Sequence, residues 1–372
     1  MKVIIAPDSF KNALRANEVA RALAAGWGKL RQQDELIMLP MSDGGEGLCD
    51  ALCTALHGKF VDIPVHDSLM RLRQGRAVIA GDTAVIESAE ANGIELLKRS
   101  ELAPLETTTF GVGEIFRTLV TQYHCRNFII GIGGSATVDG GIGMLQALGY
   151  RFLRADGSVV PNGAGGGVID EIVKIDDTAV EPLLKKVQIK VACDVNNVLC
   201  GNDGSAAVFG PQKGATPEMV KILDRNLSHF AKLFGENGDV PGDGAAGGLG
   251  FALRMLGGQM ESGAKIVMRE TGFVSALAGA DLVITGEGCS DDQTACGKLC
   301  ASIALEAKAA GVPTVLVSGA LRGDCSELEK LFAGCFSISR GVSTLEDALK
   351  DTAVNLEKCT ASLAAFAGGL CD

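Results

Sequence analysis

The sequence predicts an α/β protein in which a second α/β or α+β domain interrupts a doubly wound parallel sheet. The first observation is a set of short apolar runs, rich in β-branched or aliphatic residues, which are typical of buried parallel strands. These runs lie near the two ends of the 372-residue chain, at 3–6, 35–39, 281–284, 314–318 and 335–339. The second is that helical patterns lie between the runs, which gives the alternation of strand and helix that such a sheet requires.

The helical patterns are clearest after the first two runs. Val19, Leu23 and Trp27 recur four residues apart, and so do the leucines at 48, 52 and 56. Residues at this spacing share one face of a helix, which can then pack on a sheet. Each of the two N-terminal strands is therefore expected to lead into a helix.

The third observation is that the residue pattern in the middle of the chain differs from that at its two ends. Residues 60–65 alternate in polarity, and the apolar runs 77–79 and 84–86 flank Gly81-Asp82 as in a β-hairpin. Further strands are expected at 127–131, 149–153 and 187–192, with a helix at 113–124 and a glycine-rich loop at 163–167.

This contrast predicts two domains, and two domains are also common for a chain of this length. The first is discontinuous and comprises residues 1–58 plus 271–372. The second is inserted and comprises residues 59–270.

Composition limits the functions open to the chain. The formal net charge of −11 disfavours nucleic acid as a partner, since binding a polyanion requires a basic face. No apolar run approaches the ~18 residues of a membrane span. Met1-Lys2 leads directly into the first strand without a secretory leader, so the twelve cysteines are expected to be reduced and the protein cytoplasmic. The sequence leaves open whether the protein forms a homo-oligomer.

Polar clusters follow the expected strands of the first domain. Asp-Ser-Phe-Lys at 8–11 follows the first strand, Ser-Asp-Gly-Gly-Glu-Gly at 42–47 the second, and Thr-Gly-Glu-Gly at 285–288, with Asp291, the third. Ligands of open α/β sheets bind outside the carboxyl ends of the strands. We therefore expect these segments to bring carboxylates, one lysine and backbone amides toward one ligand site.

The inserted region contributes two comparable clusters, residues 131–141 after strand 127–131 and Cys193-Asp194 after strand 187–192. Glycines in such loops leave backbone N–H groups accessible to phosphate or carboxylate oxygens. Structural interpretations remain open as well: Asp43 and Asp194 could cap a helix or a turn, residues 131–141 could be a plain loop, and Lys11 could be a solvated side chain. Their common placement at strand ends favours function.

Familiar phosphate-binding motifs are missing. The chain has no GxxxxGK[ST] loop, and Gly131-Ile132-Gly133 lacks the full GxGxxG spacing. A kinase with this sequence is therefore not of the Walker type.

The clusters, in their order and spacing, resemble the bacterial glycerate kinase family. The matching segments extend over nearly the whole chain: 6–11, 43–47, 133–137, 139–141, 192–195, 209–215, 244–248 and 285–288, with Asp291, Gln293, Thr294, Gly297 and Lys298. The resemblance implies a flavodoxin-like domain interrupted by an inserted α/β domain. It also implies ATP and Mg²⁺ as cofactors, D-glycerate as substrate and 2-phosphoglycerate as product.

Two departures from the family pattern concern the expected site. Val138 stands where the family usually has Asn, and Cys289 stands where it usually has Arg. They leave two alternatives open, a kinase for a related hydroxy acid and a non-catalytic sensor that binds a hydroxy acid.

Roles follow from the chemistry of phosphoryl transfer, in which positioning and charge neutralisation dominate. Asp194 is the expected base and Asp43 the alternative, while Lys11 would hold the transferring phosphate. Glu287 and Asp291 would hold Mg²⁺, with Asp8 as a possible third ligand. The expected substrate and phosphate contacts are Asp8, Ser42, Gly44, Gly45, Gly133, Gly134, Ser135, Thr137 and Asp139.

Overall fold

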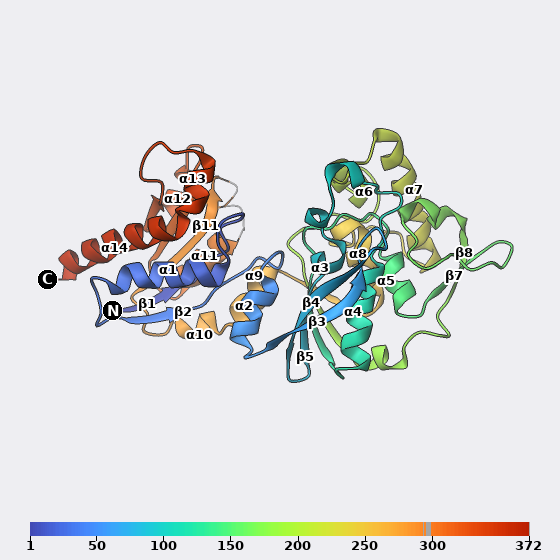
Figure 1. Cartoon of the computed structure of the whole chain (residues 1–372), viewed down its shortest axis with the longest axis horizontal. Helices are drawn as coiled ribbons and strands as arrows, with labels where there is room; N and C mark the ends of the chain where they lie inside the picture. Colours follow the sequence, from blue (N-terminus) through green and yellow to red (C-terminus); the bar gives the residue numbers. More distant parts are fainter. Residues whose placement is uncertain (293, 295–298, 372) are drawn as a thin grey trace. The chain divides into compact units, whose positions relative to one another are not determined.

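The computed structural model describes residues 1–292, 294 and 299–371, which form two compact units (Figure 1). The first unit comprises residues 1–43, 50–56 and 264–372, and the second comprises 44–49 and 57–263. Compared with the expected division, residues 44–49 and 57–58 belong to the second unit and residues 264–270 to the first. The predicted cluster 42–47 is thus divided, with residues 42–43 in the first unit and residues 44–47 in the second.

The described residues of the first unit form a five-stranded sheet in the order β2-β1-β11-β12-β13, with every pair parallel. The strands are β1 (Lys2–Ile5), β2 (Glu35–Met38), β11 (Leu282–Ser290), β12 (Thr314–Leu321) and β13 (Gly334–Ser337). All five strands predicted from the two ends of the chain are present. Their β-branched and aliphatic runs suit a sheet that is covered on both faces.

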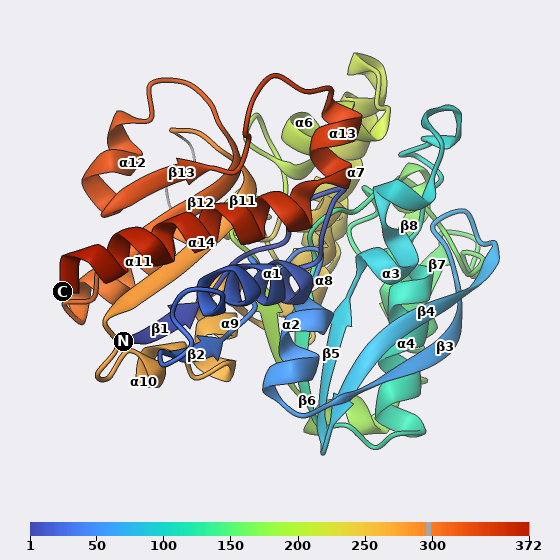
Figure 2. The same ribbon diagram turned by 60° about the vertical axis from the view of Figure 1, so that its left-hand side comes forward.

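Helices cover both faces of this sheet. On one face, Trp27 of α1 (Ala16–Gly28) and Leu356 of α14 (Thr352–Cys371) share a core with Val317 of β12. On the other face, Cys300 of α11 (Leu299–Ala309) packs with the neighbouring Leu316. Successive strand residues point to opposite faces, so Leu316 and Val317 serve different cores. Figure 2 shows α1 and α14 side by side.

The first unit contains five further helices among its described residues. They are α2 (Leu48–Ala55), whose first two residues belong to the second unit, α9 (Gly263–Glu270), whose first residue does so too, α10 (Phe273–Ala276), α12 (Ser326–Leu331) and α13 (Leu345–Lys350).

The described residues of the second unit form a six-stranded mixed sheet in the order β10-β9-β6-β5-β4-β3. The pairs from β10 to β5 are parallel and the last two are antiparallel. The strands are β3 (Lys59–His66), β4 (Leu72–Ala80), β5 (Thr83–Glu87), β6 (Asn127–Gly131), β9 (Gln188–Ala192) and β10 (Gln259–Glu261). The predicted hairpin around Gly81-Asp82 is confirmed as β4 and β5.

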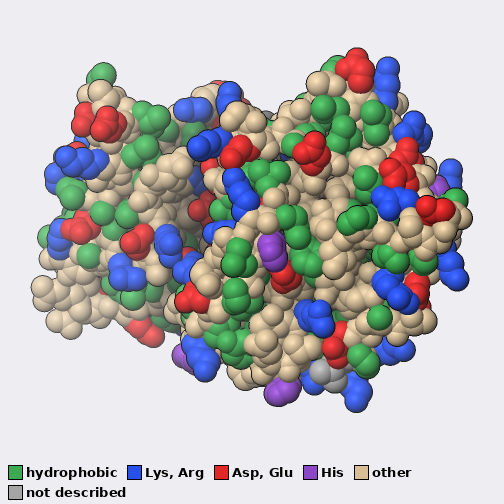
Figure 3. Space-filling view, turned by 45° about the vertical axis from the view of Figure 1, so that its right-hand side comes forward, with side chains coloured by type: hydrophobic (Ala, Val, Ile, Leu, Met, Phe, Trp, Pro, Cys, Tyr) green, Lys and Arg blue, Asp and Glu red, His purple; other side chains and the backbone are tan. Residues whose placement is uncertain are grey.

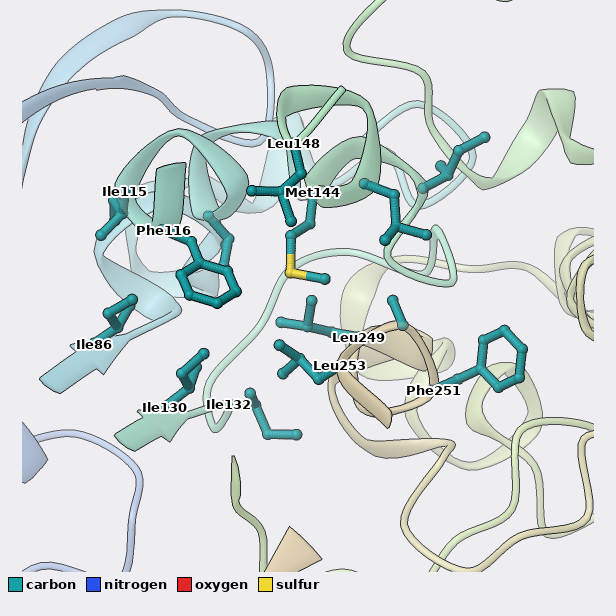
Figure 4. Close-up of a cluster of buried hydrophobic side chains, with 14 of the residues drawn as sticks. Ile86, Ile115, Phe116, Ile130, Ile132, Met144, Leu148, Leu249, Phe251 and Leu253 are labelled. Atoms are coloured by element: carbon teal, nitrogen blue, oxygen red, sulfur yellow. The ribbon is translucent and has the colours of Figure 1, made fainter. Parts of the chain in front are cut away.

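A large apolar core fills the second unit. Figure 4 shows part of this core, in which Ile86 and Ile130 of the sheet lie near Phe116 of α4 and Met144 of α5. Leu253 of α8, from a distant part of the chain, belongs to the same cluster. The helices are α3 (Ala89–Asn92), α4 (Phe110–Thr121), α5 (Ile142–Ala147), α6 (Ser205–Phe209), α7 (Pro217–Leu233) and α8 (Leu249–Met255). Short 3₁₀ helices cover residues 94–96, 99–101, 166–171, 182–186, 211–213 and 245–248.

The strand expected at 149–153 is present as β7 (Arg151–Arg154), which pairs with β8 (Ile172–Asp176) in a separate two-stranded sheet. One sequence prediction needs correction. The third strand of the first domain was expected to end at 284, but β11 continues to Ser290. The cause is pairing with β12, in which Glu287 lies opposite Ser318, so the 285–288 cluster is part of the strand and does not follow it.

The surface is mixed in charge. On the face shown in Figure 3, Lys and Arg side chains lie among Asp and Glu side chains and do not gather in one area. Within the described ranges, no helix is both long and apolar enough to cross a membrane.

Candidate active site

The first unit carries polar residues at the ends of three neighbouring strands. From β1 the strand order runs both ways, to β2 on one side and to β11 on the other, and open parallel sheets bind ligands where this occurs. The chain after β1 stays beside β11, because Asp8 N donates a hydrogen bond to Gly286 O at 2.8 Å. Asp8 and Glu287 therefore lie on adjacent segments.

Three carboxylates interact at this edge. Burial, together with the negative charges of Asp43 and Glu287, raises the pKa of Asp8 to about 7. A hydrogen bond of 2.6 Å from Ser9 N and the positive charge of Lys11 act in the opposite direction but do not cancel the rise. Among the residues that the structure describes, the acidic groups around Asp8 outweigh the positive charge of Lys11, which favours a bound cation.

Glu287 is held in place by hydroxyl groups. Ser290 Oγ and Thr294 Oγ1 both donate to its Oε1, at 2.8 and 2.7 Å, and Ser290 Oγ also lies 2.6 Å from Ser318 Oγ. The other carboxylate oxygen, Oε2, accepts no hydrogen bond from the residues that the structure describes. A fixed carboxylate with one uncommitted oxygen is well suited to coordinate a hard cation.

The other predicted residues of the first unit differ in exposure. Lys11 and Asp43 are exposed and Asp291 is half-buried, whereas Ser42 is completely buried. The exposed Lys11 could reach an anion from solvent. The Ser42 side chain faces the protein interior, which suits a structural role better than the predicted contact with a ligand.

In the second unit, two glycine-rich segments pack against each other. Gly44 has a φ of +92°, and a Cβ there would lie 2.7 Å from Ala192 Cβ and 3.0 Å from Gly263 Cα. A Cβ on Gly131 would lie 2.3 Å from Gly44 O. Larger residues at either position would push the segments apart, so the sequence needs glycine here. Two clusters predicted separately are thus brought together.

The loop after β6 is braced along its length by the segment around α3. Ser88 N donates to Gly131 O at 2.8 Å, and Ile94 N donates to Gly134 O at 2.8 Å. Asn92 makes two further contacts: its carbonyl accepts from Ala136 N at 2.7 Å, and its Nδ2 donates to Thr137 Oγ1 at 3.2 Å. Within this braced loop Gly133 and Gly134 are exposed, while Ser135 and Thr137 are buried.

Asp139 is the internal anchor of the loop. Its fully buried carboxylate accepts hydrogen bonds from Thr109 N and Thr109 Oγ1, both at 2.8 Å, from Gly141 N at 3.1 Å and from Gly143 N at 3.3 Å. Burial raises the pKa of Asp139, and these donors oppose the rise. With so many internal donors, the carboxylate shapes the loop, whereas the sequence had suggested direct contact with a ligand.

Lys213 lies beneath the same loop. Its Nζ donates to Ser135 Oγ at 2.7 Å and to Thr137 O at 2.8 Å, and its side chain is only 2% exposed. Burial lowers the pKa of Lys213 to about 7, and the charge of Asp139 opposes this. The loop therefore combines a buried lysine, bonded to Ser135 and Thr137, with two exposed glycines, Gly133 and Gly134.

Asp194 follows β9, as predicted. Its Oδ1 accepts a hydrogen bond from Gly263 N, the first residue of α9, at 3.2 Å. A carboxylate at a helix N-terminus stabilises the helix through the unpaired N–H groups and the helix dipole. The predicted base thus also has a structural function.

No group of three or more His, Cys, Asp or Glu side chains in the described ranges could hold a metal by itself. Magnesium usually keeps several waters and takes one or two carboxylates together with substrate phosphates. Glu287, with one free oxygen in an acidic environment, fits that pattern.

Comparisons with known proteins connect both polar regions to one family. The sequence profile of the glycerate kinase family matches residues 3–367. The chain belongs to the glycerate kinase family. A Haemophilus influenzae protein named glycerate kinase is 43% identical over 365 residues, which cover 96% of each chain. An Escherichia coli protein named glycerate 2-kinase is 39% identical over 374 residues, which cover 98% of this chain and 97% of that one.

A solved structure agrees with this membership. A crystal structure from Salmonella typhimurium LT2, described there as a provisional glycerate kinase 2, superposes with a TM-score of 0.89 at 39% identity. The match covers 99% of this chain and 98% of the other. The predicted family is therefore confirmed, and the fold is that of an α/β protein with a parallel five-stranded sheet and a second, mixed sheet.

The two departures from the glycerate kinase pattern have different surroundings. Val138 is completely buried in the apolar core of the second unit, so it does not face a ligand. Cys289 is half-buried on β11, opposite Ala320 of β12 and two residues beyond Glu287. Of the two, only Cys289 lies beside a predicted site residue.

The structure adds residues that the sequence reasoning did not select. Asn92, Thr109, Lys213 and Ser290 hold predicted site residues in place, and Ser318 contacts Ser290. The run Thr107-Thr108-Thr109 before a helical pattern was a usable signal, since threonines often occupy such positions. Lys213 lies in the matching segment 209–215, but the sequence gave it no role. Gln293, Gly297 and Lys298 of the family match lie outside the described residues.

Proposed function

We propose that this chain transfers the γ-phosphoryl group of MgATP to a hydroxyl group of D-glycerate, with 2-phosphoglycerate as the product. The observation that carries the proposal is the match to the glycerate kinase family over residues 3–367, which includes every predicted polar cluster. The product is proposed because the similar Escherichia coli protein is named glycerate 2-kinase.

In this proposal the first unit handles the metal and the phosphates. Glu287 and Asp291 would hold Mg²⁺, with Asp8 as a further ligand, and Lys11 would contact the transferring phosphate. Bound Mg²⁺ supplies charge neutralisation at the phosphate oxygens. The raised pKa of Asp8 supports this assignment, because a cation would favour the charged carboxylate.

The second unit would bind the acceptor. Gly133 and Gly134 are exposed, and Ser135 and Thr137 belong to the same loop, so this loop would offer donors to anionic oxygens. Together with Lys11, the backbone around Gly44 and Gly45 would hold the transferring phosphate. Asp194 would accept the proton of the reacting hydroxyl, and Asp43 is the alternative base.

We also propose that the first unit is a flavodoxin-like domain and the second an insertion in it. Numbered within the first unit, the sheet order is 2-1-3-4-5, which is the flavodoxin order, and this supports the assignment. Domain boundaries near 58 and 270 remain a proposal that limited proteolysis can test.

The test is to incubate the purified protein with D-glycerate and MgATP and to locate the transferred phosphate by ³¹P NMR. We expect 2-phosphoglycerate; 3-phosphoglycerate would overturn the assignment of the hydroxyl. ADP release without a phosphoglycerate would favour another hydroxy acid as acceptor. Glycerate binding without turnover would favour the sensor.

A further inference from the structure

We propose that Lys213 is a positioning residue that acts through Ser135 on the carboxylate of the bound hydroxy acid. This inference rests on the proposed function and assigns a subsite within it. Lys213 contacts the loop through two hydrogen bonds that its Nζ donates, one to Ser135 Oγ at 2.7 Å and one to Thr137 O at 2.8 Å.

The hydrogen bond fixes which way the serine hydroxyl can point. An ammonium group has donors and no acceptor, so Ser135 Oγ must accept from Lys213 and keeps its own proton to donate elsewhere. No acceptor for that proton is found among the described residues. Ser135 is 6% exposed and follows the exposed Gly133 and Gly134, so the hydroxyl proton is available to an anionic oxygen placed on the loop.

The positive charge of Lys213 is not neutralised by a salt bridge to any residue that the structure describes. The charged group that interacts with it electrostatically is Asp139. Asp139 already accepts four hydrogen bonds from Thr109, Gly141 and Gly143. A buried cation without a direct counter-ion is costly, and a substrate carboxylate on the other side of Ser135 would offset that cost.

The local backbone keeps Lys213 in this position. It ends the 3₁₀ helix Pro211–Lys213, and the next residue, Gly214, has a φ of +92°. Lys213 N also donates to Gly210 O at 3.0 Å. The ammonium is therefore presented from a rigid turn, as a positioning role requires.

The alternative is that Lys213 only supports the loop. That role predicts a lower melting temperature for a variant, with unchanged affinity for each substrate per folded molecule. The positioning role predicts a selective loss for the acid. It also predicts a pH dependence, because the pKa of Lys213 is lowered to about 7 and only its charged form polarises Ser135.

The experiment compares wild type with Lys213→Met, Ser135→Ala, the double variant and a control, Lys221→Met, which removes an exposed lysine from α7. Glycerate binding is measured by calorimetry without nucleotide, and both KM values are measured from pH 6 to 9. We expect each single variant to weaken glycerate binding about 10- to 100-fold, as for loss of a charge-assisted hydrogen bond, with the KM for ATP unchanged. The double variant should lose little more, since both residues act in one chain of contacts.

Wild-type affinity for glycerate should fall as the pH rises above about 7, and both single variants should lose that dependence. Unchanged glycerate affinity in folded Lys213→Met, a raised KM for ATP instead, or fully additive losses would each overturn the inference. If Lys213→Met does not fold, Ser135→Ala decides it: wild-type affinity and pH dependence would refute the role. Wild type that binds glycerate without turnover contradicts the proposed function alone, whereas no glycerate binding contradicts both.

Discussion

The polar regions of the two units surround their central carboxylates, the half-buried Asp8 and the fully buried Asp139, in opposite ways. Asp8, in the first unit, has one backbone donor at 2.6 Å and two acidic neighbours, Asp43 and Glu287. Asp139, in the second unit, has four hydrogen bonds from the protein and a buried lysine nearby. The pKa of both carboxyl groups is raised by burial, but among the described residues only the surroundings of Asp8 are short of positive charge.

This difference indicates what each region is suited to bind. A bound metal ion stabilises an acidic cluster that has too few cations. A loop that combines backbone N–H groups with a buried lysine is stabilised instead by a bound anion. The following predictions test that contrast, beginning with the largest expected effect.

Asp194→Asn should have the largest effect if Asp194 is the base. Turnover should fall by ~10²–10⁴, the usual scale of general-base catalysis, with little change in nucleotide affinity and no rescue by magnesium. Steady-state kinetics and the melting temperature of the same sample measure this.

The hydrogen bond from Gly263 N provides the competing outcome. If Asp194 only caps α9, the variant should lose stability while its turnover per folded molecule stays close to that of wild type. Rescue by magnesium would instead move Asp194 to the metal site and leave Asp43 as the candidate base.

Asp139→Asn should come next, and it should act on stability. An amide can accept at only one atom, so its NH₂ group would face donors that now bind the carboxylate, at a cost of about 3 kcal/mol. Urea unfolding should show this loss, accompanied by weaker glycerate binding. A stable variant with normal glycerate affinity would contradict the idea that Asp139 anchors the loop.

Glu287→Gln should have a smaller and recoverable effect. Removing the charge weakens a magnesium ligand without changing its shape, so turnover should fall about 10-fold or more and partly return at high magnesium. A rate that does not depend on the magnesium concentration would remove Glu287 from the metal site.

Asp8→Asn should have the smallest effect, visible in the pH dependence of stability. The folded pKa of Asp8 is about 7, above its usual value of 3.8, so the folded state binds more protons than the unfolded state between these limits. Its contribution to stability is therefore present below about pH 4 and is lost as the pH rises to about 7.

The variant should lack that part of the slope, and added Mg²⁺ should reduce it in wild type. Chemical unfolding of both proteins at pH 5 and pH 8 measures the difference. Parallel pH profiles for the two proteins would contradict the proposed charge shortage around Asp8.

The sequence predicted those features that depend on local pattern. The five strands of the first unit were found because their β-branched and aliphatic runs are short and bounded by turn residues. The clusters after them were found because glycine and polar residues stand out against apolar strands. The family resemblance then connected these clusters to one chemistry.

What the sequence did not predict depends on contacts between distant residues. The hydrogen bond from Lys213 to Ser135 spans 78 positions, and the one from Gly263 to Asp194 spans 69. The true end of β11 depends on its pairing with β12. The residue pattern of a single sequence contains no information on such contacts, so the inward orientation of Asp139 and Ser42 could not be inferred either.

The central claim is that the first unit binds the metal and its nucleotide while the second binds the acid. The most direct measurement is a pair of calorimetric titrations, with MgATP and with D-glycerate, on Glu287→Gln and Ser135→Ala. We expect Glu287→Gln to lose affinity for MgATP alone and Ser135→Ala to lose affinity for glycerate alone. If either variant weakens both ligands equally while remaining folded, or if the pattern is reversed, the division between the units is wrong.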